Sequence, residues 1–206
     1  MFTGIVAAVG NITRVEPLGT GAGLRVHVEA PTLGLSDVAV GDSIAVRGAC
    51  MTVVAVHPSG FDFEVSGESL ARTVGLDAPG PVNLEKAMRL TDRVGGHLVS
   101  GHVDGVGRVV RFEPAGESWV LDVEAPLSMA RYLVYKGSIT VDGVSLTVNQ
   151  VTDVPHGCVV SINLIPHTLA ATTLKALVPG AQVNLEIDMI ARYLDRMRAV
   201  DAAAAG

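Results

Sequence analysis

At three pairs of positions in this chain the two side chains differ, and in each pair at least one of them can act as a nucleophile or transfer a proton. The members of each pair lie about a hundred residues apart: Cys50 and Ser145, Ile5 and His102, Ala87 and Asp188. A thiol, a hydroxyl, an imidazole and a carboxylate can each act as a nucleophile or transfer a proton. A pocket that offers a thiol in one half and a hydroxyl in the other could hold two copies of one molecule and treat them differently.

These residues also have purely structural interpretations. Cys50 lies in an apolar strand pattern, where a free cysteine often serves as a small buried hydrophobic residue. Asp188 precedes a helical pattern and could simply cap that helix. His97 and His102 could donate to backbone carbonyls, and together with Cys50 they carry no recognised metal-ligand spacing, so we expect no metal site. The residues alone therefore predict a two-part small-molecule binder, with an enzyme as one alternative.

The pairs correspond because the chain repeats itself. Ser100–Gly107 matches Thr3–Gly10, and four further blocks return in the same order: Val28–Pro31 with Val123–Pro126, Ser43–Val53 with Ser138–Val148, Glu68–Thr73 with His167–Thr172, and Val82–Glu85 with Val183–Glu186. Blocks that recur in order at a fixed distance indicate a duplicated domain. We predict an N-terminal domain over 1–96, a C-terminal domain over 97–186, and a distinct tail over 187–206.

Composition excludes several classes of protein. The 206 residues carry a net charge of -6 with only 17% charged residues, which argues against a nucleic-acid-binding surface. Although the mean hydropathy is +0.42, every apolar run ends well before the roughly 18 residues of a membrane helix. The two cysteines form no CxxC pair, and the N-terminus has no signal-like segment. We expect a cytoplasmic protein without disulfides.

Short strands dominate the pattern of each half. Leu24–Glu29 alternates strictly, and Ile5–Val15 is apolar or alternating, with a glycine cluster over 19–23 between them. We interpret that cluster as a hairpin rather than a phosphate-binding loop, because no helix follows it. Ser69–Thr73 could form one helical turn. About six strands per half with regular turns predict an all-β fold of two closed antiparallel barrels.

The tail differs from the rest of the chain. Its apolar residues fall at helical spacing: Ile187, Ile190, Ala191, Leu194 and Met197. A lone helix of about fourteen residues is marginal in water, so it should pack either on symmetry-related copies or on its own barrel. Residues 201–206 are expected to be a frayed end.

Taken together, the motifs closely resemble the riboflavin synthase family of the alpha-chain type. They run in order along most of the chain: Met1–Val6, Gly48–Val53, Gly95–Gly105, Tyr135–Gly137, Asp142–Val148, Leu164–Leu169 and Val183–Asp188. The resemblance implies two six-stranded Greek-key barrels, a C-terminal helix that holds a homotrimer, and no metal or organic cofactor. It also implies the reaction: two molecules of 6,7-dimethyl-8-ribityllumazine exchange a four-carbon unit to give riboflavin and 5-amino-6-(ribitylamino)uracil, with sites between subunits.

The resemblance assigns site residues motif by motif. The implied catalytic residues are His102, Cys50, Ser43, Ser145, Thr147 and Asp188. The first substrate site is expected to be lined by Gly4, Ile5, Val6, Cys50, Met51, Thr52, Glu64, Val65, Ser66, Gly67, Glu68 and Ser69. The second is expected to be lined by Gly101, His102, Val103, Lys136, Ser145, Leu146, Thr147, Asn163, Leu164, Ile165, Pro166, His167 and Thr168.

Two other functions fit parts of the pattern. Lumazine-binding antenna proteins resemble this family but do not catalyse, and in them the polar residues of one barrel should be lost. A flavin-dependent reductase would need a dinucleotide-binding βαβ unit, which the sequence lacks. Arg47, Ala49 and Met51 depart from the usual family pattern beside the cysteine. Neither a nucleic acid nor a membrane is an expected partner, whereas docking with lumazine synthase is a further expectation.

Overall fold

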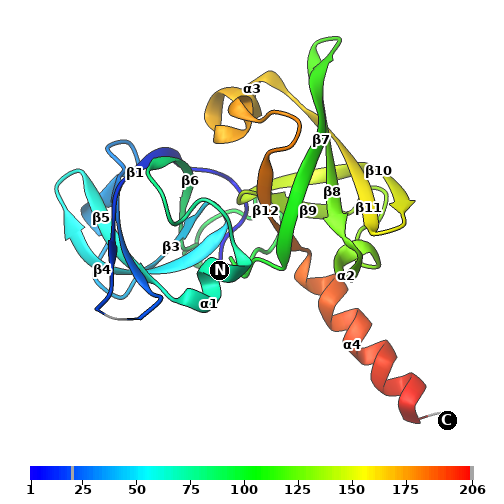
Figure 1. Cartoon of the computed structure of the whole chain (residues 1–206), viewed down its shortest axis with the longest axis horizontal. Helices are drawn as coiled ribbons and strands as arrows, with labels where there is room; N and C mark the ends of the chain where they lie inside the picture. Colours follow the sequence, from blue (N-terminus) through cyan, green and yellow to red (C-terminus); the bar gives the residue numbers. More distant parts are fainter. Residues whose placement is uncertain (20, 205–206) are drawn as a thin grey trace.

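The computed structural model describes residues 1–19 and 21–204, which form two β-barrels side by side and a projecting helix (Figure 1). The strands of the first barrel are β1 (Ala8–Pro17), β2 (Leu24–Glu29), β3 (Ser43–Val46), β4 (Ala49–His57), β5 (Gly60–Val65) and β6 (Gly80–Lys86). Those of the second are β7 (Gly105–Ala115), β8 (Ser118–Pro126), β9 (Ser138–Val141), β10 (Val144–Val154), β11 (Gly157–Leu164) and β12 (Gln182–Ile187). The helices are α1 (Gly67–Arg72), α2 (Leu127–Ala130), α3 (Pro166–Ala171) and α4 (Met189–Ala204), with 3-10 turns at Leu35–Asp37 and Thr173–Ala176.

The two barrels have the same topology. Both are closed and antiparallel, with strand orders β1-β2-β5-β4-β3-β6 and β7-β8-β11-β10-β9-β12. The register shifts recur as well, in β1 and β4 of the first barrel and in β7 and β10 of the second. The predicted pair of six-stranded antiparallel barrels is confirmed. Closing each sheet leaves these short strands without an exposed edge.

Each barrel has its own hydrophobic core, built by the alternation of side chains along its strands. In β5, Phe61 and Phe63 are fully buried, with their ring centroids 6.4 Å apart. A third, smaller cluster joins the segments that precede the two barrels. There Phe2 N donates to Val99 O (2.8 Å) and Val99 N donates to Phe2 O (3.0 Å).

Two buried asparagines fasten the barrels to each other. Asn83 in β6 donates to Asp142 O at 2.9 Å and accepts from the Thr173 backbone N at 2.8 Å. Asn184, its counterpart in β12, donates to Arg47 O at 3.0 Å and accepts from the backbone N of Val74 at 2.8 Å. Each asparagine crosses to the other half of the chain, so the two halves meet around an approximate twofold axis.

Three boundaries differ from the sequence prediction. The first strand begins at Ala8 rather than Ile5, because the segment that follows Thr3 crosses to the opposite barrel. Helix α1 lies slightly earlier than expected, with Ser66 as its N-cap. Helix α4 continues to Ala204, so residues 201–204 are helical and not frayed. Thr20 of the predicted hairpin and residues 205–206 of the predicted frayed end lie outside the described residues.

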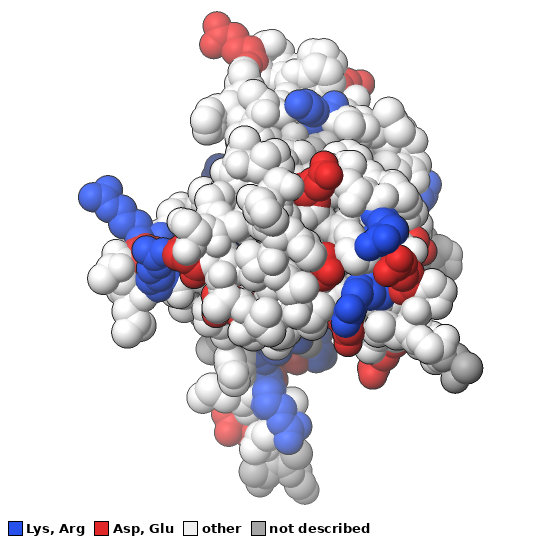
Figure 2. Space-filling model, turned by 90° about the vertical axis from the view of Figure 1, so that its left-hand side faces the viewer, with Lys and Arg blue, Asp and Glu red and all other residues white. Residues whose placement is uncertain are grey.

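Helix α4 projects away from both barrels (Figure 1). Its first half is held by Arg131 and Tyr132, which bond Asp195, and by Arg192, which bonds Asp104. The predicted apolar stripe is largely exposed, with Ile190, Leu194 and Met197 at 60%, 55% and 63%. No helix in the described part of the chain is long and apolar enough to cross a membrane. Figure 2 shows acidic and basic side chains interspersed on the face of the N-terminal barrel.

Candidate active site

A buried glutamate anchors the chain segment that precedes each barrel. Glu85 accepts hydrogen bonds from Thr3 N (2.7 Å), Thr3 Oγ1 (2.8 Å) and the next backbone N–H (3.0 Å). Glu186 accepts the equivalent bonds from Ser100 N (2.7 Å), Ser100 Oγ (2.6 Å) and the next N–H (2.9 Å). Burial raises the pKa of both carboxyls, and these hydrogen bonds oppose the rise. The two glutamates fix the start of each barrel and are not free to act on a substrate.

Beyond its anchor, each segment crosses to the opposite barrel. Gly4, with φ +74°, accepts a hydrogen bond at its carbonyl from Ser145 N (2.7 Å), and Gly101, with φ +77°, accepts one from Cys50 N (2.8 Å). A Cβ on Gly4 would lie 2.6 Å from Ser145 Cβ, and one on Gly101 would lie 2.7 Å from Cys50 Cβ. Only glycine combines this backbone conformation with such a close approach.

This exchange corrects the expected grouping of residues. The sequence reasoning placed Gly4–Val6 with Cys50–Thr52, and Gly101–Val103 with Ser145–Thr147. In the structure Gly4–Val6 lies against Ser145, whereas Gly101–Val103 lies against Cys50. The last residue of each segment packs on the core of the opposite barrel. The grouping was wrong because each segment was assumed to stay with the strand that follows it.

At one end of the first barrel, which we call the N-terminal mouth, three predicted stretches converge. The β4–β5 register, with Val53 opposite Phe63, brings Cys50–Thr52 to the same end as Glu64–Ser69, and Gly101–Val103 covers Cys50. The thiol of Cys50 is half-buried and Thr52 is exposed. Met51 and Val65, both predicted to line the site, point into the barrel core instead.

The C-terminal mouth repeats this arrangement in the second barrel. Val148 stands opposite Ile162, which brings Ser145–Thr147 to the same end as Asn163–Thr168, and Gly4–Val6 covers Ser145. Leu164 is buried in the core. Lys136 is exposed, with φ +63°, and its Nζ donates to Asn149 Oδ1 at 3.2 Å. Within the described chain, each mouth therefore combines an exchanged segment with the first residues of a strand (β4 or β10) and the start of a short helix (α1 or α3).

His97, considered from the sequence only as a structural residue or metal ligand, lies at the C-terminal mouth. Its Nδ1 lies 2.8 Å from Ser145 Oγ, while its Nε2 is buried without a partner among the described residues. Burial lowers the pKa of the imidazole, and the charge of Asp188 opposes this. A neutral imidazole in contact with a hydroxyl has the geometry of a base and its nucleophile. No spacing in the sequence links positions 97 and 145. His97 N donates to Thr3 O at 3.2 Å, directly before the Gly4–Val6 segment that covers Ser145.

His102 lies by contrast at the N-terminal mouth, directly after the glycine that contacts Cys50. Its backbone N donates to Ser100 Oγ at 3.3 Å, and its side chain is exposed, with no hydrogen-bond partner among the described residues. An exposed imidazole at this mouth can exchange a proton with a molecule bound there. Each mouth thus has one histidine.

Ser43 and Asp188 line equivalent cavities next to the mouths. Ser43 faces a cavity of about 210 Å³ with Asp37 and Lys86, whereas Asp188 faces one of about 340 Å³ between α4 and Ser138. Asp188 also accepts from Ile190 N at 2.9 Å and so caps α4, as its structural interpretation predicted. Its position at the junction of the barrel and α4 makes both roles geometrically compatible.

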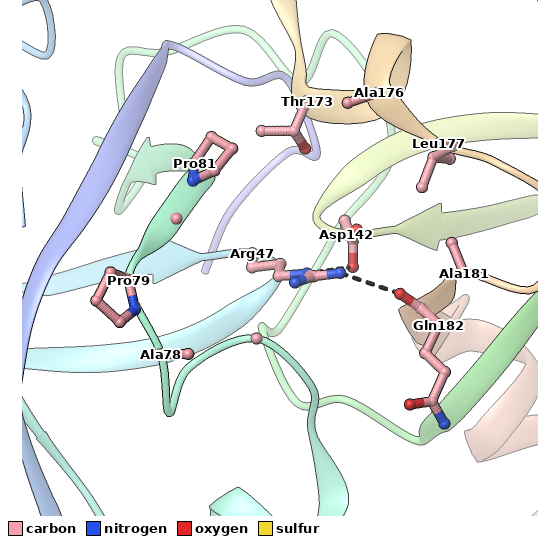
Figure 3. A pocket seen from close by; sticks show the side chains of 12 residues that line it. Arg47, Ala78, Pro79, Pro81, Asp142, Thr173, Ala176, Leu177, Ala181 and Gln182 are labelled. Carbon is pink, nitrogen blue, oxygen red and sulfur yellow. Dashed lines mark hydrogen bonds and ion pairs between the residues drawn. The ribbon is translucent and has the colours of Figure 1, made fainter.

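A further cavity, of about 390 Å³, opens between the barrels near the twofold axis (Figure 3). It holds none of the predicted site residues. Arg47 Nε donates to Asp142 Oδ1 at 3.1 Å, and Arg47 Nη2 donates to Gln182 O at 3.0 Å. Burial raises the pKa of the Asp142 carboxyl, against the effect of the Arg47 charge. The charged residues that line this cavity are already paired with each other. They help to join the barrels, and the cavity offers no reactive group.

Known proteins share this doubled arrangement. The model of the lumazine binding domain matches residues 3–87 and again 100–188. A riboflavin synthase of Photobacterium leiognathi is 44% identical, over 98% of this chain and 90% of the relative. One of Mycobacterium bovis is 45% identical, over 96% of this chain and 98% of the relative. The chain belongs to the riboflavin synthase family. The resemblance stated from the motifs is confirmed, and members of this family are enzymes.

A structural relative of the family clarifies the alternative function. The crystal structure of LumP complexed with riboflavin superposes with a TM-score of 0.79 at 25% identity, covering 91% of this chain and 99% of LumP. LumP shares the fold and binds a flavin, yet it is far less similar in sequence than the synthases. The antenna alternative is therefore not favoured for a chain that keeps both mouths polar.

Proposed function

We propose that this chain catalyses the dismutation of 6,7-dimethyl-8-ribityllumazine. Two lumazine molecules exchange a four-carbon unit, so that one becomes riboflavin and the other 5-amino-6-(ribitylamino)uracil. The reaction needs no external oxidant, since one molecule gives up what the other accepts. It does need a base that removes a proton from the C7 methyl of one lumazine, and a nucleophile or activated water that adds to the other.

The observation that carries this proposal is the pair of equivalent mouths with unequal side chains. One mouth presents Cys50 with His102, and the other presents Ser145 with His97. Two copies of one substrate would bind in the same orientation, because the backbone framework is the same, but they would meet different reactive groups. Holding two flat rings in register would supply much of the acceleration through proximity and orientation.

The remaining residues have supporting roles in this proposal. Cys50 and Ser43 assist at the first lumazine, where His102 transfers a proton. Ser145, Thr147 and Asp188 orient or activate the nucleophile at the second, and His97 accepts a proton from Ser145. The other mouth residues, including Lys136, bind substrate.

The test is to incubate the purified protein with 6,7-dimethyl-8-ribityllumazine alone, in the presence of a chelator, and to follow riboflavin by its absorbance. We expect one riboflavin for every two lumazines consumed. Tight binding of lumazine without riboflavin formation would instead assign the chain to the antenna-type proteins. The Ser145→Ala variant provides a control, since it should bind lumazine but turn it over slowly.

We also propose a homotrimer, with each reactive site formed by the N-terminal mouth of one subunit and the C-terminal mouth of its neighbour. The exposed apolar residues of α4 support this assembly, because a helix whose apolar stripe stays in water is marginal in stability. Deleting the chain after Asp188 should yield monomers, as measured by sedimentation, and these monomers should still bind lumazine. A truncated chain that sediments as a trimer would contradict the role of α4.

The family also suggests a cellular setting. We propose that the enzyme is cytoplasmic and that it docks with lumazine synthase, which would supply its substrate directly. Co-sedimentation of the two purified proteins tests the docking, and absence of a joint species at micromolar concentrations would argue against it.

A further inference from the structure

Two histidines and an aspartate meet on the outer face of the N-terminal barrel, toward the β4–β5 turn and so toward the end opposite its mouth. Asp62 Oδ1 lies 2.8 Å from His27 Nδ1 and 3.0 Å from His57 Nε2. In the described part of the chain, only these three bring histidine, cysteine or acidic ligand atoms together as a metal site requires, within 4.8 Å of one another. The proposed function uses none of them.

Neighbouring strands hold this cluster in place. His27 in β2 stands directly opposite Asp62 in β5, and His57 at the end of β4 lies two residues beyond Ala55, the β4 partner of Asp62. Directly opposite and diagonal neighbours on one face of a sheet lie within reach of each other. Because three paired strands supply the three side chains, little ordering is needed to bring the ligand atoms together.

Two of the three residues are largely shielded from solvent, although the cluster lies on the outer face of the barrel. Asp62 points outward from β5, yet it is only 5% exposed, because the two imidazoles cover it. The His27 side chain is 16% exposed and that of His57 is 50% exposed. The cluster is therefore closed on the barrel side and open on one side, where it borders a hollow of about 400 Å³.

A second carboxylate orients the more buried histidine. His27 Nε2 lies 3.1 Å from Glu16 Oε2, while Arg14 bonds the other oxygen of the same carboxylate, Glu16 Oε1, at 3.2 Å. A carboxylate that accepts from one ring nitrogen fixes the tautomer that presents the other nitrogen to a metal. Glu16 thus leaves His27 Nδ1, the nitrogen next to Asp62, as the ligand atom.

We propose that His27 Nδ1, His57 Nε2 and the Asp62 carboxylate bind a zinc ion, with water as the fourth ligand. Imidazole and carboxylate are donors that Zn²⁺ accepts, and three protein ligands leave one position open on the side of the hollow. Tetrahedral coordination separates ligand atoms by about 3.3 Å, so the two contacts of Asp62, at 2.8 and 3.0 Å, need to open by only about half an ångström or less, and the two imidazole nitrogens already lie within 4.8 Å of each other.

The C-terminal barrel shows that the fold does not require this cluster. At the positions equivalent by strand register it has Asp122, Ser161 and Thr152. These supply one carboxylate and no imidazole. The second barrel closes without it, so the three ligands are a property of this chain's first barrel. Zinc would join β2, β4 and β5 and stabilise that barrel by mass action.

The test is calorimetric titration of the metal-free full-length protein with zinc chloride. We expect one saturable site per chain, weakened in His57→Gln by more than the roughly 10- to 100-fold that the loss of an outer-shell partner costs, because His57 is a direct ligand. The matched control is His156→Gln, which removes an exposed histidine near the equivalent turn of the C-terminal barrel and should leave the affinity unchanged. Because the His57 side chain is half exposed, His57→Gln should keep its melting temperature in the presence of a chelator.

A second measurement separates binding from a general effect on folding. Zinc should raise the melting temperature of the wild type and of His156→Gln, and a chelator should reverse this, whereas His57→Gln should not respond. Equal affinities in the wild type and His57→Gln, or equal weakening by both substitutions, would overturn the proposal. Riboflavin formation should be the same with and without zinc, so this test does not depend on the proposed function.

Discussion

In both barrels the Val-Asn-Leu-Glu strand has the same two attachments. Its asparagine, Asn83 or Asn184, bonds the backbone of the other half, and its glutamate, Glu85 or Glu186, anchors the segment before its own first strand. The mouths that result differ in their side chains, with Cys50 in one and Ser145 in the other. Duplication thus preserved the residues that set the backbone and left the residues that face a ligand free to diverge.

The two barrels are constrained in the same way at the glycines of the exchanged segments, where we expect substitutions to have the largest effect on stability. Gly4→Ala and Gly101→Ala should each lower the free energy of unfolding by about 4 kcal/mol, from left-handed strain and overpacking combined. Gly34→Ala is the matched control. Its φ is +69° but nothing lies within 4 Å of the added Cβ, so it should cost only about 1 to 2 kcal/mol. Urea unfolding measures all three, and equal losses would show that the close approach is not a constraint.

Arg47 and Asp142 occupy equivalent positions near the twofold axis but carry opposite charges, and removing one of these charges should have the next largest effect. Arg47→Met leaves Asp142 buried without its ion partner and should cost about 3 kcal/mol at neutral pH. Burial already raises the pKa of Asp142 above its usual 3.8, and losing Arg47 raises it further. The folded state then holds a proton that the unfolded chain releases, so the loss is small below about pH 4 and grows as the pH rises.

Unfolding of Arg47→Met at several pH values measures this effect. The double variant Arg47→Met, Asp142→Asn is its control, because an uncharged amide removes the pH dependence. If the single variant lost the same stability at pH 4 and pH 7, the buried charge would not be its cause.

The mouths can be made more alike by replacing a reactive residue with its counterpart. His102→Ile places in the second segment the residue found in the first, and it should slow riboflavin formation about 100-fold. The dissociation constant for lumazine and the unfolding free energy should change little, because the His102 side chain is exposed and makes no hydrogen bond within the described structure. Steady-state kinetics with His156→Gln as the control tests this. An unchanged rate would remove His102 from the proposed chemistry.

Exchanging the anchoring residues should have the smallest effect. Thr3→Ser and Ser100→Thr keep the hydroxyl that bonds Glu85 or Glu186, so each should change stability by less than about 1 kcal/mol, roughly the contribution of one methyl group. Ser100→Ala removes the hydrogen bond and should cost more, about 1 to 3 kcal/mol, because the buried carboxylate loses a donor. Thermal unfolding compares the three, and a larger loss in Ser100→Thr than in Ser100→Ala would contradict the equivalence of the anchors.

Much of the fold was accessible from the sequence because the signals were local or repeated. Alternation in Leu24–Glu29 and its counterparts predicted strands, and the ordered blocks predicted two barrels of the same kind. The helical spacing after Ile187 predicted α4, but its continuation to Ala204 was missed, since a run of alanines gives no amphipathic signal even though it favours helix.

The candidate site was only partly accessible. The motifs brought Cys50, His102, Ser145 and Asp188 to attention, but they assigned Gly4–Val6 and Gly101–Val103 to the wrong barrels. Met51, Val65 and Leu164 were expected at a ligand, and the structure places them in the cores. Alternation along a strand gives every second residue to the inside, and a motif read as a continuous string does not separate the two faces.

The sequence by itself determined the duplication, the strand pattern and the family, because each depends on residues close together in the chain or repeated in order. Only the tertiary structure decided that the two segments exchange barrels, that His97 meets Ser145, and that His27, His57 and Asp62 share one face. These contacts join residues up to more than a hundred positions apart. They depend on strand register within a barrel and on glycine-mediated close approach between the barrels, and neither follows from residues that are close together in the chain.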